Sequence, residues 1–143
     1  GDQRNTRNTR GNPNNVATIG TSNPFRFNPN ARHLIILVFE DPKIKTNPLR
    51  VQITTFNNKF YIDKRLSVSS ILIDGKKPSI SIRGAFANAQ EAMKYVRTAS
   101  GSTDFLSPET GYKIYAISRE NYALALTKQN FAQYDAFYLE NYK

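Results

Sequence analysis

The distribution of apolar residues divides the chain at about residue 32. Residues 33–39 form a continuous apolar run, rich in β-branched side chains, which ends at Glu40-Asp41-Pro42. A short run of this kind, bounded by turn-forming residues, predicts a strand that is buried on both faces. We therefore expect this strand to lie in the centre of a sheet.

The next segment has the periodicity of a helix. Its apolar residues recur at intervals of four, three and four: Leu49, Ile53, Phe56 and Phe60. With Asn47 as a cap and Pro48 at the first helical position, the pattern predicts an amphipathic helix over about residues 48–61. Partial alternation in residues 66–73 and 79–83, on either side of an Asp-Gly turn, then predicts a β-hairpin.

The second half of the chain repeats the alternation of helix and strand. Asn88 followed by Glu91 resembles a capping box, and an apolar face follows, so we expect a helix over about residues 88–99. Alternation predicts a fourth strand over residues 112–117. Ser118 can cap an aromatic-rich helical segment that we expect over residues 120–142.

This order predicts an α+β protein, a ferredoxin-like βαββαβ sandwich with an extra C-terminal helical segment. The first and third strands should lie centrally, and both helices should cover one face of the sheet. We predict the opposite face as the candidate interaction face: Ser69, Ile71, Ser81, Arg83, Lys113 and Tyr115. The C-terminal aromatic residues either cover this face as core or form an interface themselves.

Residues 1–31 differ from the rest, being rich in Asn, Arg and Pro. Such a segment has too little apolar surface to offset its ordering entropy, so we expect a disordered tail or linker before a domain over residues 32–143. The tail has one apolar stretch, Phe25-Arg26-Phe27, which we expect to lean on the domain.

Composition excludes several kinds of chemistry. The chain has no Cys and one His, His33, which rules out thiolate nucleophiles and clusters of several metal-binding histidines. No common nucleotide-binding or hydrolase motif is present. We therefore predict no enzyme activity, no catalytic residue, no cofactor and no metal site. The longest apolar run is too short for a transmembrane segment.

The net charge of +9 raises the possibility of an anionic partner. The basic residues are scattered, however, and form no block of like charge. An RNA-recognition motif would stack bases on aromatic side chains of its third strand, whereas residues 78–83 here contain none. The sequence therefore disfavours nucleic acid as a partner.

Several stretches together are similar to one known family. In chain order they are His33-Leu-Ile-Ile-Leu-Val-Phe39, Phe56-Asn57-x-x-Phe60, Leu66-Ser-Val-Ser-Ser70, Ala89-x-x-Ala92-Met93-x-Tyr95, Tyr112-Lys-Ile-Tyr-Ala-Ile-Ser118 and Tyr134-x-x-Phe137-Tyr138-x-x-Asn141-Tyr142. Over residues 32–142 the chain resembles the C-terminal domain of tetratricopeptide-repeat lipoproteins of the Bacteroidetes cell envelope, a group that includes gliding-motility and type IX secretion components.

That resemblance implies a non-enzymatic interaction or scaffold module in the periplasm or cell envelope. Its partner would be a protein of an envelope assembly, and an upstream repeat domain is one candidate. Because the repeats are missing here, we expect the chain to be part of a longer protein. Two alternatives share the predicted topology: a domain that binds peptidoglycan or another polysaccharide, and a regulatory domain that binds a small molecule.

Overall fold

A computed structural model describes residues 23–129 and 131–142 of the chain. Over these residues it contains four strands and four α-helices, which confirms the predicted α+β class. The elements are β1 (His33–Phe39), α1 (Thr46–Phe60), η2 (Ile62–Lys64), β2 (Ser67–Ile73), β3 (Lys77–Phe86), α2 (Ala89–Ser100), η3 (Pro108–Thr110), β4 (Tyr112–Ser118), α3 (Arg119–Lys128) and α4 (Phe131–Asn141).

The four strands form one antiparallel sheet in the order β2-β3-β1-β4. The first and third strands are thus central, as predicted. Every residue of β1 is buried, which agrees with its uninterrupted apolar sequence. Ile36 of β1 lies opposite Ser81 of β3 and Tyr115 of β4, so these three side chains share one face of the sheet.

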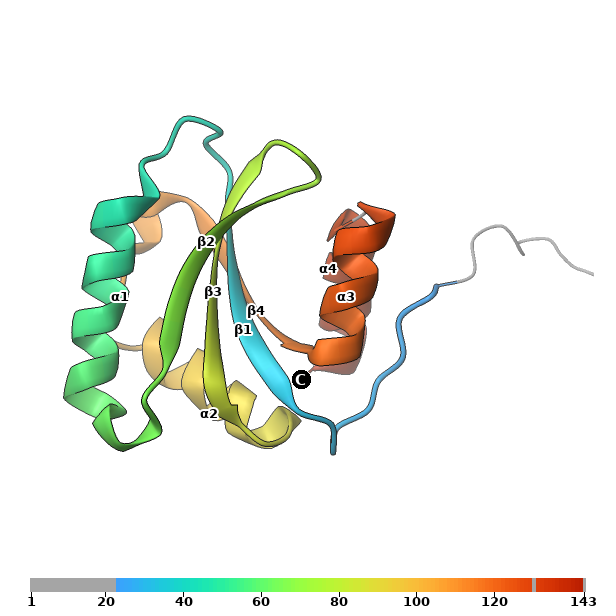
Figure 1. Ribbon diagram of the computed structural model, residues 1–143, viewed down its shortest axis with the longest axis horizontal. Helices are drawn as coiled ribbons and strands as arrows, with labels where there is room; N and C mark the ends of the chain where they lie inside the picture. Colours follow the sequence, from blue (N-terminus) through green and yellow to red (C-terminus); the bar gives the residue numbers. More distant parts are fainter. Residues whose placement is uncertain (1–22, 130, 143) are drawn as a thin grey trace, which may run out of the picture.

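The molecule has three layers, with α1 and α2 on one side of the sheet and α3 and α4 on the other (Figure 1). Aromatic rings join the layer of α1 and α2. The ring of Phe56 lies 5.9 Å from that of Tyr95 and 5.1 Å from that of Phe105, both edge-on. The buried Tyr95 hydroxyl donates a hydrogen bond to Asn57 Oδ1 at 2.6 Å, which satisfies the hydroxyl inside the core.

The C-terminal aromatic residues belong to the core. Tyr115 on the sheet is in edge contact with Phe131 and Tyr138 of α4, at ring distances of 5.0 and 5.1 Å. The Tyr134 hydroxyl donates to the backbone oxygen of Ala116 at 2.6 Å. The sequence left open whether these rings cover the sheet or form an interface, and in the structure they cover it.

The predicted helical segment over residues 120–142 is two helices. α3 ends at Lys128 and is followed by its capping residue Gln129, whose φ of 52° places it in the left-handed region, and α4 begins at Phe131. Left-handed backbone at a helix C-terminus breaks the pattern of i to i−4 hydrogen bonds. The break allows α4 to turn back along the sheet beside α3.

Residues 23–31 pack against this C-terminal layer. Phe25 is 3% exposed, and its ring lies 5.1 Å from that of Tyr134 and 5.8 Å from that of Phe137. The side chain of buried Asn121 accepts from the backbone N–H of Arg26 and donates to its carbonyl oxygen, at 3.2 and 2.8 Å. The end of the predicted tail is therefore tied to the domain, and residues 1–22 lie outside the described part.

Candidate anion-binding site

Four arginines meet at one end of the sheet. Because neighbouring strands run in opposite directions, β1 and β2 begin at the end where β3 and β4 finish. Arg32 precedes β1, Arg65 precedes β2, Arg83 lies near the end of β3, and Arg119 follows β4. All four line one pocket of about 310 Å³, together with His33, Leu34, Ser67, Gly84, Ala85, Phe86 and Tyr122.

An irregularity in β3 shapes the floor of this pocket. Between the pairs His33↔Phe86 and Ile35↔Ile82, two steps along β1 correspond to four along β3. Such a bulge kinks the strand and redirects its side chains. The predicted strand over residues 79–83 ends too early for this reason, because pairing resumes at Phe86 after the bulge, and it also misses the first two residues of β3.

Gly84 lies in the bulge and brings two pocket segments together. Its φ of +135° is a conformation that side-chain-bearing residues rarely adopt. A Cβ placed there would be 3.4 Å from the backbone oxygen of Arg65 and 3.7 Å from Cα of Leu66. Glycine at this position thus lets β3 lie close to the segment that carries Arg65.

The start of α3 also lines the pocket, through Arg119 and Tyr122. The backbone N–H of Arg119 donates to the carbonyl oxygen of Arg32 at 3.1 Å, which holds these two arginine-bearing segments together. Ser118 caps the helix by accepting from the N–H of Asn121 at 3.2 Å. The first turn of a helix carries partial positive charge, which adds to that of the guanidinium groups, whereas Glu120 in the same turn reduces it.

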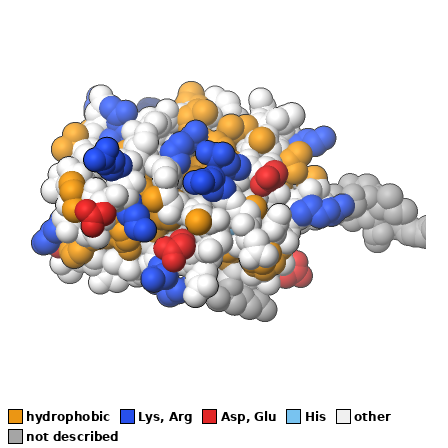
Figure 2. Space-filling view, turned by 60° about the horizontal axis from the view of Figure 1, so that its bottom comes forward, with side chains coloured by type: hydrophobic (Ala, Val, Ile, Leu, Met, Phe, Trp, Pro, Cys, Tyr) orange, Lys and Arg blue, Asp and Glu red, His pale blue; other side chains and the backbone are white. Residues whose placement is uncertain are grey.

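The four arginines of the pocket form no ion pair with a described carboxylate. Among the described residues, no carboxylate lies within 4 Å of any of the four guanidinium groups. The Arg83 guanidinium instead lies over the Tyr122 ring, 5.6 Å from its centre. In Figure 2, which turns the lower end of Figure 1 forward, Lys and Arg side chains gather near the middle of the visible face.

His33 forms the buried back of the pocket. Its Nδ1 lies 2.7 Å from the carbonyl oxygen of Ala31, and its Nε2 lies 2.7 Å from the hydroxyl of Tyr142. Because a carbonyl oxygen can only accept, Nδ1 carries the proton, and in the neutral ring Nε2 accepts from Tyr142. Burial lowers the pKa of His33 below its ordinary value, against smaller opposing effects of the hydrogen bond to Ala31 and of the Glu120 carboxylate. The ring therefore acts as a neutral structural group.

The residues of the predicted interaction face share one side of the sheet but differ in exposure. Ser81 and Tyr115 are buried beneath the C-terminal layer. The Tyr115 hydroxyl donates to Asp135 Oδ1 at 2.5 Å, and Lys113 lies 3.8 Å from the same carboxylate oxygen. Ser69 and Ile71 of β2 are exposed. Of the six predicted residues, Arg83 is the one that lines the arginine pocket.

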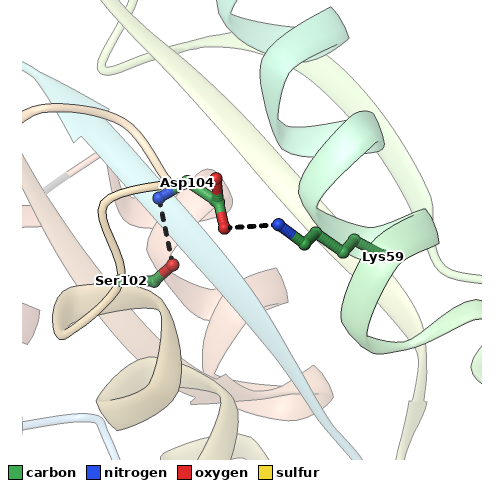
Figure 3. Close-up of polar contacts among 3 residues, drawn as sticks. All are labelled: Lys59, Ser102 and Asp104. Carbon is green, nitrogen blue, oxygen red and sulfur yellow. Dashed lines mark hydrogen bonds and ion pairs between the residues drawn. The ribbon is translucent and has the colours of Figure 1, made fainter.

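Two further polar sites differ from this pocket in charge. A pocket of about 230 Å³ at the other end of the sheet contains both signs, from Glu40 and Asp135 against Lys77 and Lys113. On the side of α1, Lys59 reaches the carboxylate of Asp104 at 3.0 Å, and the Asp104 N–H donates to Ser102 Oγ (Figure 3). In both places acidic residues already balance the lysines.

Sequence reasoning missed Arg32, Arg65 and Arg119 as site residues. They lie 33 or more positions from one another, so no local run of charge marks them. The predicted strand order does indicate the cluster, because it places the starts of the first two strands beside the ends of the last two. Each of the four arginines lies at or next to one of these strand ends, so the order predicts that they are neighbours.

Comparisons with family models, with curated proteins and with solved structures found no match to this chain. Within residues 23–129 and 131–142, no helix combines the length and apolar character needed to cross a membrane. The same residues contain no group of three or more His, Asp or Glu side chains that could hold a metal ion.

Proposed function

We propose that this protein is a non-enzymatic binding module that recognises carboxylate groups of a protein partner through the arginine pocket. The observation that supports this function is that four arginines line one pocket, with no carboxylate within 4 Å of their guanidinium groups among the described residues. Like charges gathered in this way repel one another, and an anionic partner would relieve that repulsion.

The chemistry of the pocket suits carboxylates. A guanidinium group presents a planar fork of N–H donors that matches a carboxylate in a two-point contact. The volume of about 310 Å³ is at the lower end of the range for ligand pockets, which suits one or two acidic side chains better than a large ligand. All four arginines are exposed, so a partner can reach them.

We propose further that the domain has the ferredoxin-like arrangement and works in a bacterial envelope protein. The antiparallel order β2-β3-β1-β4, with α1 and α2 on one face, supports the first proposal. The resemblance of residues 32–142 to envelope lipoproteins supports the second. The C-terminal layer that covers β1, β3 and β4 directs recognition to the ends and edges of the sheet.

Binding to labelled poly-L-glutamate, followed by fluorescence anisotropy at low and at moderate salt, tests the proposed function. Replacing Arg65 or Arg83 with Gln should weaken binding at least about tenfold, since a hydrogen bond to a charged group contributes about 1.5–3 kcal/mol. Arg97→Gln, an equal change of charge on the exposed face of α2, is the matched control and should have little effect.

Equal effects of Arg83→Gln and Arg97→Gln would contradict a defined site, because they would indicate attraction by net charge alone. Parallel assays with purified peptidoglycan sacculi and with a single-stranded oligonucleotide address other anionic partners. Pocket-dependent binding to either of these, without binding to poly-L-glutamate, would overturn the proposal of a protein partner.

A further inference from the structure

Strand β2 forms an open edge of the sheet beside the arginine pocket. It has β3 as its one neighbour, and all its residues except Val68 and Ile73 are exposed. Among the described residues, no backbone group outside the β2–β3 hairpin pairs with its outer edge. Every second residue of an edge strand points an N–H and a C=O outward, so this edge offers a row of free hydrogen-bonding groups.

The sequence of β2 lacks the features that usually prevent an edge strand from pairing with another chain. Natural edge strands are commonly guarded by Lys, by Pro or by a bulge, whereas Ser67–Ile73 contains no charged residue and no Pro, and it pairs with β3 without interruption. The opposite edge strand, β4, carries Lys113 and is largely buried. An unguarded edge strand is a template for an added strand from another chain.

The pocket lies at the end of this edge. Ser67 is both the first residue of β2 and a lining residue of the pocket, and Arg65 lies two positions before it. A peptide that pairs antiparallel to β2 would begin near Ile73 and finish at Ser67. Its C-terminal residues would then enter the arginine pocket.

We infer that β2 binds an extended peptide of the partner as a fifth, antiparallel strand, with the acidic C-terminal end of that peptide held in the arginine pocket. This inference rests on the proposed function, since it names the form in which the carboxylates are presented. Backbone hydrogen bonds to β2 supply affinity, and the arginines supply direction and selectivity for negative charge.

Charge argues against a second copy of the chain as the occupant. If two β2 strands paired antiparallel about a two-fold axis, the turn after β2 of one copy would lie near Arg65 of the other. That turn contains Lys76 and is followed directly by Lys77, the first residue of β3, so two positive charges would face the arginines. The net charge of +9 on each chain opposes the association as well.

The far end of β2 suggests the rest of the peptide. Ile71 and Leu72 are 41% and 58% exposed, on opposite faces of the strand. They lie four and five residues from Ser67, which corresponds to roughly 13–17 Å along a strand. We therefore expect apolar peptide residues beside Ile71 and Leu72, followed after about four residues by an acidic C-terminus.

The test is an NMR titration of the ¹⁵N-labelled full chain with the peptide acetyl-Val-Thr-Val-Thr-Val-Glu, which has a free C-terminus. Four control peptides accompany it: one with Gln and a C-terminal amide in place of the acidic end, one with reversed sequence, and two N-methylated at either the Val or the Thr residues. An antiparallel added strand donates hydrogen bonds from every second residue. One N-methylated peptide should therefore lose binding while the other keeps it.

We expect the free-acid peptide to shift the amide signals of β2 and the guanidinium signals of the pocket together, and the uncharged peptide to bind at least tenfold more weakly. Pocket shifts with equal binding of both N-methylated peptides, or no β2 shifts at millimolar peptide, would overturn the inference while leaving the proposed function standing. If poly-L-glutamate also fails to shift the pocket, the proposed function fails with it. Concentration-dependent dimerisation through β2 in the absence of peptide would overturn the inference in favour of a second copy.

Discussion

Replacing Phe25 with Ala tests whether residues 23–31 are part of the folded domain. Phe25 is 3% exposed and packs edge-on against Tyr134. Burial of about 150 Å² of apolar surface beyond that of Ala corresponds to about 4 kcal/mol at about 25 cal/mol per Å², which is an upper bound. Because the segment can shift toward the vacated space, the cavity adds little, and we expect a loss of about 3 kcal/mol.

Urea unfolding of the full chain measures this loss of free energy directly. In thermal unfolding, at roughly 4 °C per kcal/mol for a domain of this size, Tm should fall by about 12 °C. The matched control is Phe27→Ala. Phe27 lies in the same segment and contacts the Tyr142 ring, but its side chain is 42% exposed. The control should cost about 1 kcal/mol. Equal costs of the two substitutions, or a loss below about 1 kcal/mol for Phe25→Ala, would refute the placement of Phe25 in the core.

Three further predictions concern stability. Tyr134→Phe removes the donor to the buried oxygen of Ala116, so the free energy of unfolding in urea should fall by about 1–3 kcal/mol, and an unchanged value would contradict that hydrogen bond. The pKa of His33 is lowered from 6.5, so the unfolded state binds more protons than the folded state as the pH falls below that value. The free energy of unfolding of the wild type should therefore fall more steeply than that of His33→Gln between pH 7 and pH 5. Parallel curves of this free energy against pH would contradict the burial of a neutral ring. Asp104→Asn should change the free energy of unfolding by less than about 1 kcal/mol, because the ion pair of Asp104 with Lys59 is exposed. A larger loss in thermal unfolding would contradict the small contribution expected of an exposed ion pair.

Elements with strong local patterns were predicted well from the sequence. The seven-residue strand β1 has the predicted bounds, and α1 and α2 begin and end within two residues of the predicted helices. In these elements the local preference and the tertiary packing favour the same structure. The break between α3 and α4 was missed because Gln129, which adopts the left-handed conformation there, is not a typical helix-ending residue.

The remaining differences depend on contacts between residues far apart in the chain. Composition alone predicts that residues 23–31 lack structure, but Asn121 binds the backbone of Arg26 from 95 positions away. The candidate site also depends on long-range contacts, since Arg32, Arg65 and Arg119 become neighbours only when the strands pair. Local sequence patterns do not show that these arginines are neighbours, whereas the strand order predicted from those patterns does.

The most direct measurement of anion recognition is an NMR titration of the full chain with glutarate, following the Nε–Hε signals of the arginine side chains. We predict that the signals of Arg32, Arg65, Arg83 and Arg119 shift along one saturable curve, while those of Arg50 and Arg97, which lie outside the pocket, stay in place. A common, unsaturated drift of all arginine signals would contradict a defined anion-binding pocket.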